Sequence, residues 1–155
     1  MKLNTDKTNY ILFHKKYQTA FNHNQTLSIQ MNSTEIKHAI NPILLGITLD
    51  KHLNFIEHFK SLTKSLNPKI NLIKILSTKH YNINRQHLLT IYKSLILSKL
   101  QYSMFPYLTT TKYIRNKIQV MQNRILKTIL KVPFFTRTKL IHSLTNIDPI
   151  EKIIK

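Results

Sequence analysis

The sequence predicts an α+β protein, with a small antiparallel sheet followed by an α-helical, bundle-like region. Short runs of β-type residues fill the first part of the chain. After residue 53, apolar side chains recur at steps of three and four, which is typical of amphipathic helices. The 155 residues suffice for one ordinary domain, which we divide into a sheet region, 1–53, and a helical region, 54–155.

The strand prediction rests on four short runs between turn-like segments. In residues 26–30 apolar and polar side chains alternate, as in a strand with one buried face. The other runs are residues 9–13, 35–40 and 43–49. Gly46 is the only glycine of the chain, so its position indicates a backbone that needs a positive φ or a close approach by another segment.

The helix prediction rests on apolar stripes and on signals at the helix ends. The first helix is expected over residues 56–76, with a kink or a split at Pro68. The second is expected to run from a cap at Asn84 to about Tyr102. The remaining helices are expected at residues 111–131, at residues 136–144, and in a last turn that begins at Pro149 and is capped by Asp148.

The charge of the chain is strongly positive. It has 24 Lys and Arg against 6 Asp and Glu, for a formal net charge of +18. No carboxylate lies between Glu57 and Asp148, although 16 Lys and Arg do. Lys outnumbers Arg by 20 to 4, which indicates a compositional bias as well. A field of this sign has to be met by a polyanion, by an acidic partner or by another part of a larger protein.

Several kinds of chemistry are excluded by what the sequence contains. One glycine is too few for a P-loop or a dinucleotide fingerprint, and the absence of Cys excludes disulfides and thiolate chemistry. The acidic residues are scattered, and no His pair has the spacing of a zinc site, so no metal is expected to bind this chain. No signal peptide or membrane span is predicted, so we expect an intracellular protein, nuclear or cytoplasmic, that is not secreted.

A basic stripe on the third predicted helix is the positive functional signal. Its members fall within roughly 80° of one another, on the side opposite the apolar stripe, and are Lys117, Arg124, Lys127 and Lys131. We interpret them as contacts to nucleic-acid phosphates; a solvated face with biased composition is the alternative. The same role is predicted for Lys93 and Lys99. The basic residues of the first helix point in different directions and are weaker candidates, namely Lys60, Lys64, Lys69 and Lys74.

Five segments, taken in order, resemble boxes of non-LTR (LINE-type, jockey-like) retrotransposon reverse transcriptases. Residues 3–13 resemble an L-N-x-x-K-T-x-x-x-x-F box, and residues 45–58 resemble L-G-x-x-L-D-x-x-L-x-F-x-x-H. The others are residues 91–102, the Q-N-x-x-L-R-like helix at residues 118–127, and residues 132–150. The chain departs from the family at residues 102–107, which lack the Gly and Trp of the usual Y-G-x-x-x-W.

The resemblance implies that residues 1–53 are the end of a polymerase palm and that residues 54–155 are a thumb. It implies a place near the incoming nucleotide for Lys7, and a primer-grip-like hairpin for Leu45, Gly46 and Asp50. The fingers and the catalytic palm, with its paired Asp, would lie before Met1. The partners implied are RNA, DNA or an RNA–DNA hybrid, together with that palm and those fingers. Mg²⁺ would act in the full-length polymerase, and this chain alone is expected not to polymerise.

Three alternatives stay open from the sequence. The chain could be a free-standing basic helical protein that binds nucleic acid, or a translated relic without function. A membrane-surface role for the Lys-rich helices comes last, because there is no Trp to anchor them at an interface.

Overall fold

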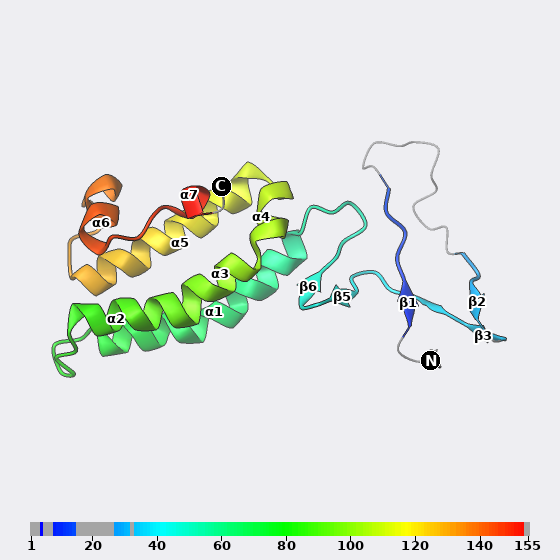
Figure 1. The fold of residues 1–155 in the computed structure, drawn as a ribbon, viewed down its shortest axis with the longest axis horizontal. Helices are drawn as coiled ribbons and strands as arrows, with labels where there is room; N and C mark the ends of the chain where they lie inside the picture. The colour runs from blue at the N-terminus through cyan, green and yellow to red at the C-terminus, as the bar shows by residue number, and fades with distance from the viewer. Residues whose placement is uncertain (1–3, 5–7, 15–26, 32, 154–155) are drawn as a thin grey trace.

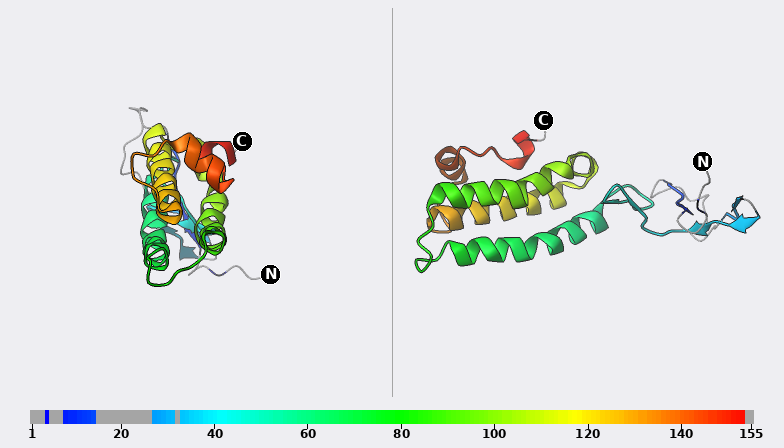
Figure 2. Two further views of the ribbon diagram at one scale, coloured as in Figure 1. Left: turned by 90° about the vertical axis from the view of Figure 1, so that its left-hand side faces the viewer. Right: turned by 60° about the horizontal axis from the view of Figure 1, so that its bottom comes forward.

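The computed structural model describes residues 4, 8–14, 27–31 and 33–153, and it confirms the α+β class (Figure 1). Short strands occupy the N-terminal part, and helices follow from residue 56 onwards. Figures 1 and 2 show that the strand region extends from one end of a bundle in which the long helices run side by side. No helix among the described residues is long and apolar enough to cross a membrane.

The strands form three separate two-stranded ladders, where one small antiparallel sheet was predicted. Their pairs are β1 (Asn9–Tyr10) with β4 (Lys37–His38), β2 (Gln30–Met31) with β3 (Thr34–Glu35), and β5 (Ile43–Leu44) with β6 (Ile47–Thr48). The β2–β3 and β5–β6 pairs are antiparallel, whereas β1 and β4 pair in parallel. Each strand is two residues long, so no continuous apolar face forms.

The first helix, α1 (Ile56–Leu76), is continuous through Pro68, so the predicted split does not occur. Proline removes one N–H from the helix ladder, at a cost of about 3 kcal/mol in a helix interior. Leu66 and Ile73 lie on either side of Pro68 and are both fully buried, so packing holds the helix together across the proline.

The second predicted helix is a continuous run of three segments. These are α2 (Arg85–Tyr92), a π-helical turn η2 (Lys93–Leu97) and α3 (Ser98–Tyr102). The side chain of Asn84 caps the run, because its Oδ1 accepts a hydrogen bond from Gln86 N at 3.2 Å. The helix α4 (Met104–Thr109) follows directly and was not predicted.

The predicted helix at residues 111–131 is confirmed as α5 (Lys112–Leu130), which ends where Lys131 adopts a left-handed conformation. The short helices α6 (Thr138–Thr145) and α7 (Ile150–Ile153) complete the chain. Asp148 was expected to cap the last of them. Its carboxylate instead pairs with Lys152 Nζ at 2.8 Å.

The hydrophobic core lies between the helices, at the meeting of α1, α2, α5 and α6. Tyr92, Leu126 and Ile141 are fully buried within it. A polar cluster closes the α5–α7 side, where Gln122 donates to Asp148 O at 3.1 Å and accepts from Ile150 N at 3.2 Å. The bundle therefore gives α5 a fixed position against α1, and these two helices carry the candidate site.

Candidate nucleic-acid interface

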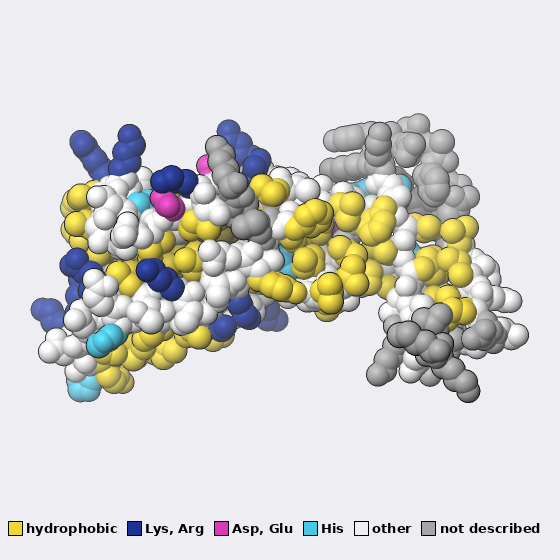
Figure 3. Space-filling view, viewed as in Figure 1, with side chains coloured by type: hydrophobic (Ala, Val, Ile, Leu, Met, Phe, Trp, Pro, Cys, Tyr) yellow, Lys and Arg dark blue, Asp and Glu magenta, His cyan; other side chains and the backbone are white. Residues whose placement is uncertain are grey.

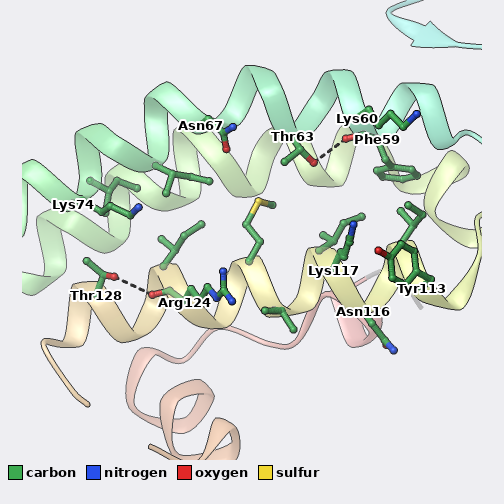
Figure 4. A pocket seen from close by; sticks show the side chains of 17 residues that line it. Phe59, Lys60, Thr63, Asn67, Lys74, Tyr113, Asn116, Lys117, Arg124 and Thr128 are labelled. Atoms are coloured by element: carbon green, nitrogen blue, oxygen red, sulfur yellow. Dashed lines mark hydrogen bonds between the residues drawn. The ribbon is translucent and has the colours of Figure 1, made fainter. Parts of the chain in front are cut away.

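A groove with a volume of about 610 Å³ lies between α1 and α5 (Figure 4). Its floor is apolar and includes Ile70, Ile118 and Met121. Its rim carries basic side chains from both helices, namely Lys60, Lys74, Lys117 and Arg124. An apolar floor beneath a cationic rim suits a ligand that has an anionic backbone and less polar faces.

The rim holds little compensating negative charge. Lys60 pairs with Glu57 at 2.6 Å, and this is the only ion pair at the groove among the described residues. Lys117 lies 4.4 Å from the centre of the Tyr113 ring, a cation–π contact that orients the lysine along the rim. Lys74 and Arg124 face the groove from opposite helices (Figure 4). Three of the four rim cations are therefore available to an anionic ligand.

The predicted basic stripe of α5 divides into two parts. Lys117 and Arg124 border the groove beside the apolar floor, so they do not lie on the opposite side of the helix as expected. Lys127 and Lys131 lie at the C-terminal end of α5, where Lys127 Nζ donates to the carbonyl of Phe134. The prediction also missed Lys60 and Lys74 as a pair. Their spacing of fourteen residues returns to nearly the same helix face, which the sequence alone could have indicated.

Lys93 and Lys99 form a second basic area on the η2–α3 segment, outside the groove. Both side chains are exposed. Lys69 of α1 lies close by, and its Nζ donates to Leu95 O at 3.4 Å. Desolvation and the nearby charge of Lys99 lower the pKa of Lys69. Lys69 and Lys99 therefore lie close together, and neither pairs with a carboxylate among the described residues.

The predicted primer-grip-like hairpin is the β5–β6 turn. Leu45 and Gly46 both have positive φ, 48° and 77°, as a two-residue type I′ hairpin loop requires. Tyr102 donates from its hydroxyl to Leu45 O, and a Cβ added at Gly46 would lie 3.7 Å from the Tyr102 ring. Of the two reasons expected for a glycine at this position, the positive φ is present, whereas a Cβ would make only an ordinary van der Waals contact with the Tyr102 ring.

Asp50 holds the chain between the hairpin and α1. Its carboxylate accepts backbone N–H groups of His52 and Asn54, each at 3.1 Å, and also that of Phe55. Phe55 is buried and has a φ of 55°, so the carboxylate stabilises a turn that few residues adopt easily. Both carboxylate oxygens of Asp50 therefore accept hydrogen bonds from the backbone of this turn.

His58 joins the hairpin to the helices. No role was predicted for it from the sequence, because it appeared there only as the last residue of the segment 45–58. Its Nδ1 accepts from Thr48 N at 3.3 Å, so its Nε2 carries the proton toward Ser103 Oγ at 3.1 Å. Only 5% of the residue is exposed, and burial lowers the pKa of His58. A neutral imidazole thus ties β6, α1 and the start of α4 together.

No metal site is present among the described residues, because no three His, Asp or Glu side chains come together. Asp50 is bonded to backbone N–H groups, while Glu57 and Asp148 are paired with lysines. These residues do not fit a Mg²⁺ site of the kind a polymerase uses. Lys7, the predicted residue near the incoming nucleotide, lies outside the described residues.

Comparison with known proteins gives three relatives of one kind. The chain is 28% identical over 111 residues to the RNA-directed DNA polymerase from mobile element jockey of Drosophila melanogaster, and 27% identical over 111 residues to that of Drosophila funebris. It is 27% identical over 110 residues to a probable RNA-directed DNA polymerase from transposon BS of Drosophila melanogaster. These matches span 72%, 72% and 71% of the chain, but only 12% of each relative.

No family profile matches the chain, and no solved structure matches it. The family that the sequence boxes resemble is nevertheless the kind of protein to which the three relatives belong. In each case the chain corresponds to only a part of the relative. The chain is thus a distant relative, over about an eighth of their length, of the jockey-type RNA-directed DNA polymerases of non-LTR retrotransposons.

Proposed function

We propose that this chain is a nucleic-acid-binding part of an RNA-directed DNA polymerase of a non-LTR retrotransposon. Residues 1–53 would be the end of the palm, and residues 54–155 the thumb. The helical part would hold RNA, DNA or an RNA–DNA hybrid through its backbone, without regard to sequence, because Lys and Arg contacts to phosphates carry no base information.

The groove between α1 and α5 is the observation that carries the proposal. Its rim presents Lys74, Lys117 and Arg124 without a carboxylate partner, over an apolar floor. The stretch between Glu57 and Asp148 has 16 basic residues and no acidic one, so no carboxylate within this stretch repels a polyanion. The relatives supply the second support, since their names describe polymerases that copy RNA into DNA.

The chain alone would not polymerise. Nucleotidyl transfer on two metal ions needs clustered carboxylates, and the described residues have none. The metal-binding acids and the Mg²⁺ would belong to the remaining palm of a polymerase, and Lys7 would act only beside them. A primer-extension assay of this chain with Mg²⁺ should show no incorporation above a control without protein. Incorporation above that control would refute this part of the proposal.

Binding is tested by fluorescence anisotropy with a labelled RNA–DNA hybrid over a range of salt concentrations. Removing two phosphate contacts with Lys117→Gln and Arg124→Gln should weaken binding about tenfold at low salt and reduce the salt slope by about 2. The control is Lys37→Gln with Lys51→Gln, which removes the same charge from exposed positions in the strand region.

Comparing the loss of affinity in the α5 pair with that in the control pair distinguishes binding at the groove from binding by net charge. A larger loss for the α5 pair than for the control pair supports the groove. Equal losses would show that binding follows the net charge of +18 alone, and absence of binding would end the proposal. A third pair, Lys93→Gln with Lys99→Gln, measures what the second basic area contributes.

A further inference from the structure

Two neighbouring phenylalanines project from the turn after α5. Phe134 is 86% exposed and Phe135 is 76% exposed. Their ring centres lie 5.5 Å apart with the planes 79° to each other, so the rings support one another while their outer faces stay open. Two adjacent phenyl rings this exposed are costly in water unless they meet a ligand.

The turn that carries the rings is held in place by hydrogen bonds. Val132 N bonds to Lys127 O at 3.2 Å, and Lys127 Nζ donates to Phe134 O. Thr136 donates to Pro133 O from its backbone N–H at 3.1 Å and from its hydroxyl at 2.7 Å. The rings are therefore presented by an ordered turn, which lowers the entropy lost when a ligand binds.

The surroundings of the two rings are basic. Lys127 and Lys131 precede them, Arg137 and Lys139 follow them, and no acidic residue occurs from residue 58 to residue 147. Lys131, Arg137 and Lys139 are exposed. Figure 3 shows Lys and Arg side chains beside hydrophobic ones at the end of the bundle where α5 leads into α6. The charge is complementary to a polyanion, and the apolar rings are complementary to its bases.

We propose that Phe134 and Phe135 form a stacking site for unpaired nucleobases. The proposal rests on the proposed function and adds to it a contact that does not depend on phosphates. Arg124, on the groove rim, is seven residues from Lys131, or about 10 Å along α5. The turn that carries the rings follows directly after Lys131, so the groove rim and the rings belong to one helix and the turn at its C-terminal end. Base–aromatic stacking is tolerant of sequence, as a non-specific polymerase contact requires.

The test compares two oligonucleotides of equal length and charge, an oligothymidylate and its abasic counterpart, both fluorescently labelled. The double variant Phe134→Ala with Phe135→Ala should bind the oligothymidylate about tenfold more weakly than the original chain does. Its affinity for the abasic oligonucleotide should not change. The salt slope should also stay the same, because no phosphate contact is lost.

Phe105→Ala is the matched control. Phe105 is 66% exposed and lies on α4, before the start of α5, whereas the stacking site follows its end. We expect it to leave both affinities unchanged. The stacking proposal is overturned if the double variant binds both oligonucleotides as the original chain does, or loses affinity for both alike. If the original chain binds neither oligonucleotide but binds the RNA–DNA hybrid, the stacking proposal alone is overturned; if it binds none of the three, the proposed function fails as well.

A tryptophan probe gives an independent readout, because the chain has no Trp of its own. In Phe135→Trp, the oligothymidylate should quench the indole fluorescence and the abasic oligonucleotide should not. Phosphatidylcholine vesicles containing phosphatidylserine test the competing ligand, an anionic membrane. A blue shift with these vesicles and no quenching by the oligothymidylate would overturn the proposal and assign the rings to a lipid surface.

Discussion

The helical region and the strand region are stabilised by different forces. Every buried hydrophobic residue of the core lies between Phe55 and Ile150. In the strand region, Ile40, Ile43 and Leu44 are 73%, 72% and 60% exposed, and each strand is only two residues long. The helices therefore bury their apolar side chains against one another, whereas β5 leaves Ile43 and Leu44 open and β6 contributes only the partly buried Ile47 to the core.

The β5–β6 hairpin keeps its place through polar contacts. Tyr102 donates to Leu45 O, His58 accepts from Thr48 N, and the Asp50 carboxylate accepts three backbone N–H groups. Those hydrogen bonds are directional, and they act together with Ile47 and Leu49, which are partly buried against the core. The apolar side chains beside them, Ile43 and Leu44, stay exposed in this structure.

The largest difference is expected from removing one leucine side chain in each region. Leu66 is fully buried in α1, so Leu66→Ala should lower the free energy of unfolding by about 3 kcal/mol. Leu44→Ala removes a side chain that is 60% exposed and should cost less than about 0.5 kcal/mol. Urea unfolding followed by circular dichroism measures both. Similar losses for the two variants would contradict the division into a packed region and an open one.

The hairpin should depend instead on Asp50. Asp50→Ala leaves three backbone N–H groups without their acceptor and should cost about 2 kcal/mol locally. Hydrogen exchange should become faster at the amides of Asn54 and Phe55, while the centre of α5 stays protected. Asp148→Ala is the control, because it breaks only an exposed ion pair with Lys152. Unchanged exchange at Asn54 would show that packing, not the carboxylate, holds the turn.

The same contrast explains what could be predicted from the sequence. Helices follow from local periodicity, so α1 and α5 were predicted within about a residue of their ends. Strand pairing depends on distant residues, and nothing in residues 9–13 indicates that β1 pairs in parallel with β4. The split predicted as one of two outcomes at Pro68 does not occur, because a rule about isolated helices competes here with burial on either side of the proline.

The candidate site was predicted in part. Lys117 and Arg124 could be chosen from their spacing, but their position beside an apolar groove requires knowledge of how α1 packs on α5. Lys60 and Lys74 belong to the same rim and were taken only as weaker candidates, although both fall on one face of α1. The exposure of Phe134 and Phe135 could not be predicted, because an aromatic pair after a helix is as compatible with a core as with a surface.

Acidification should weaken the link between the two regions at His58. Burial lowers the pKa of His58, so the unfolded chain takes up a proton at this position before the folded chain does. Its contribution to stability is complete above the ordinary histidine pKa of about 6.5 and is lost as the pH falls through the lowered folded value. Thermal melting between about pH 7.5 and 5 measures this, and His58→Gln should show a shallower dependence. An identical dependence in both proteins would assign the effect to the other histidines.

The smallest effect within the helical core is expected at Tyr92. Its ring is fully buried, burial raises the pKa of Tyr92 to about 12, and its hydroxyl has no hydrogen-bond partner. The neighbouring Gln122 amide is already bonded to Asp148 O and Ile150 N. Tyr92→Phe should therefore change the free energy of unfolding by less than about 1 kcal/mol, toward greater stability, in chemical denaturation. A loss of about 2 kcal/mol would mean that a polar contact of Tyr92 also stabilises the packing of the helices. The helical region would then not differ from the hairpin in its dependence on polar contacts.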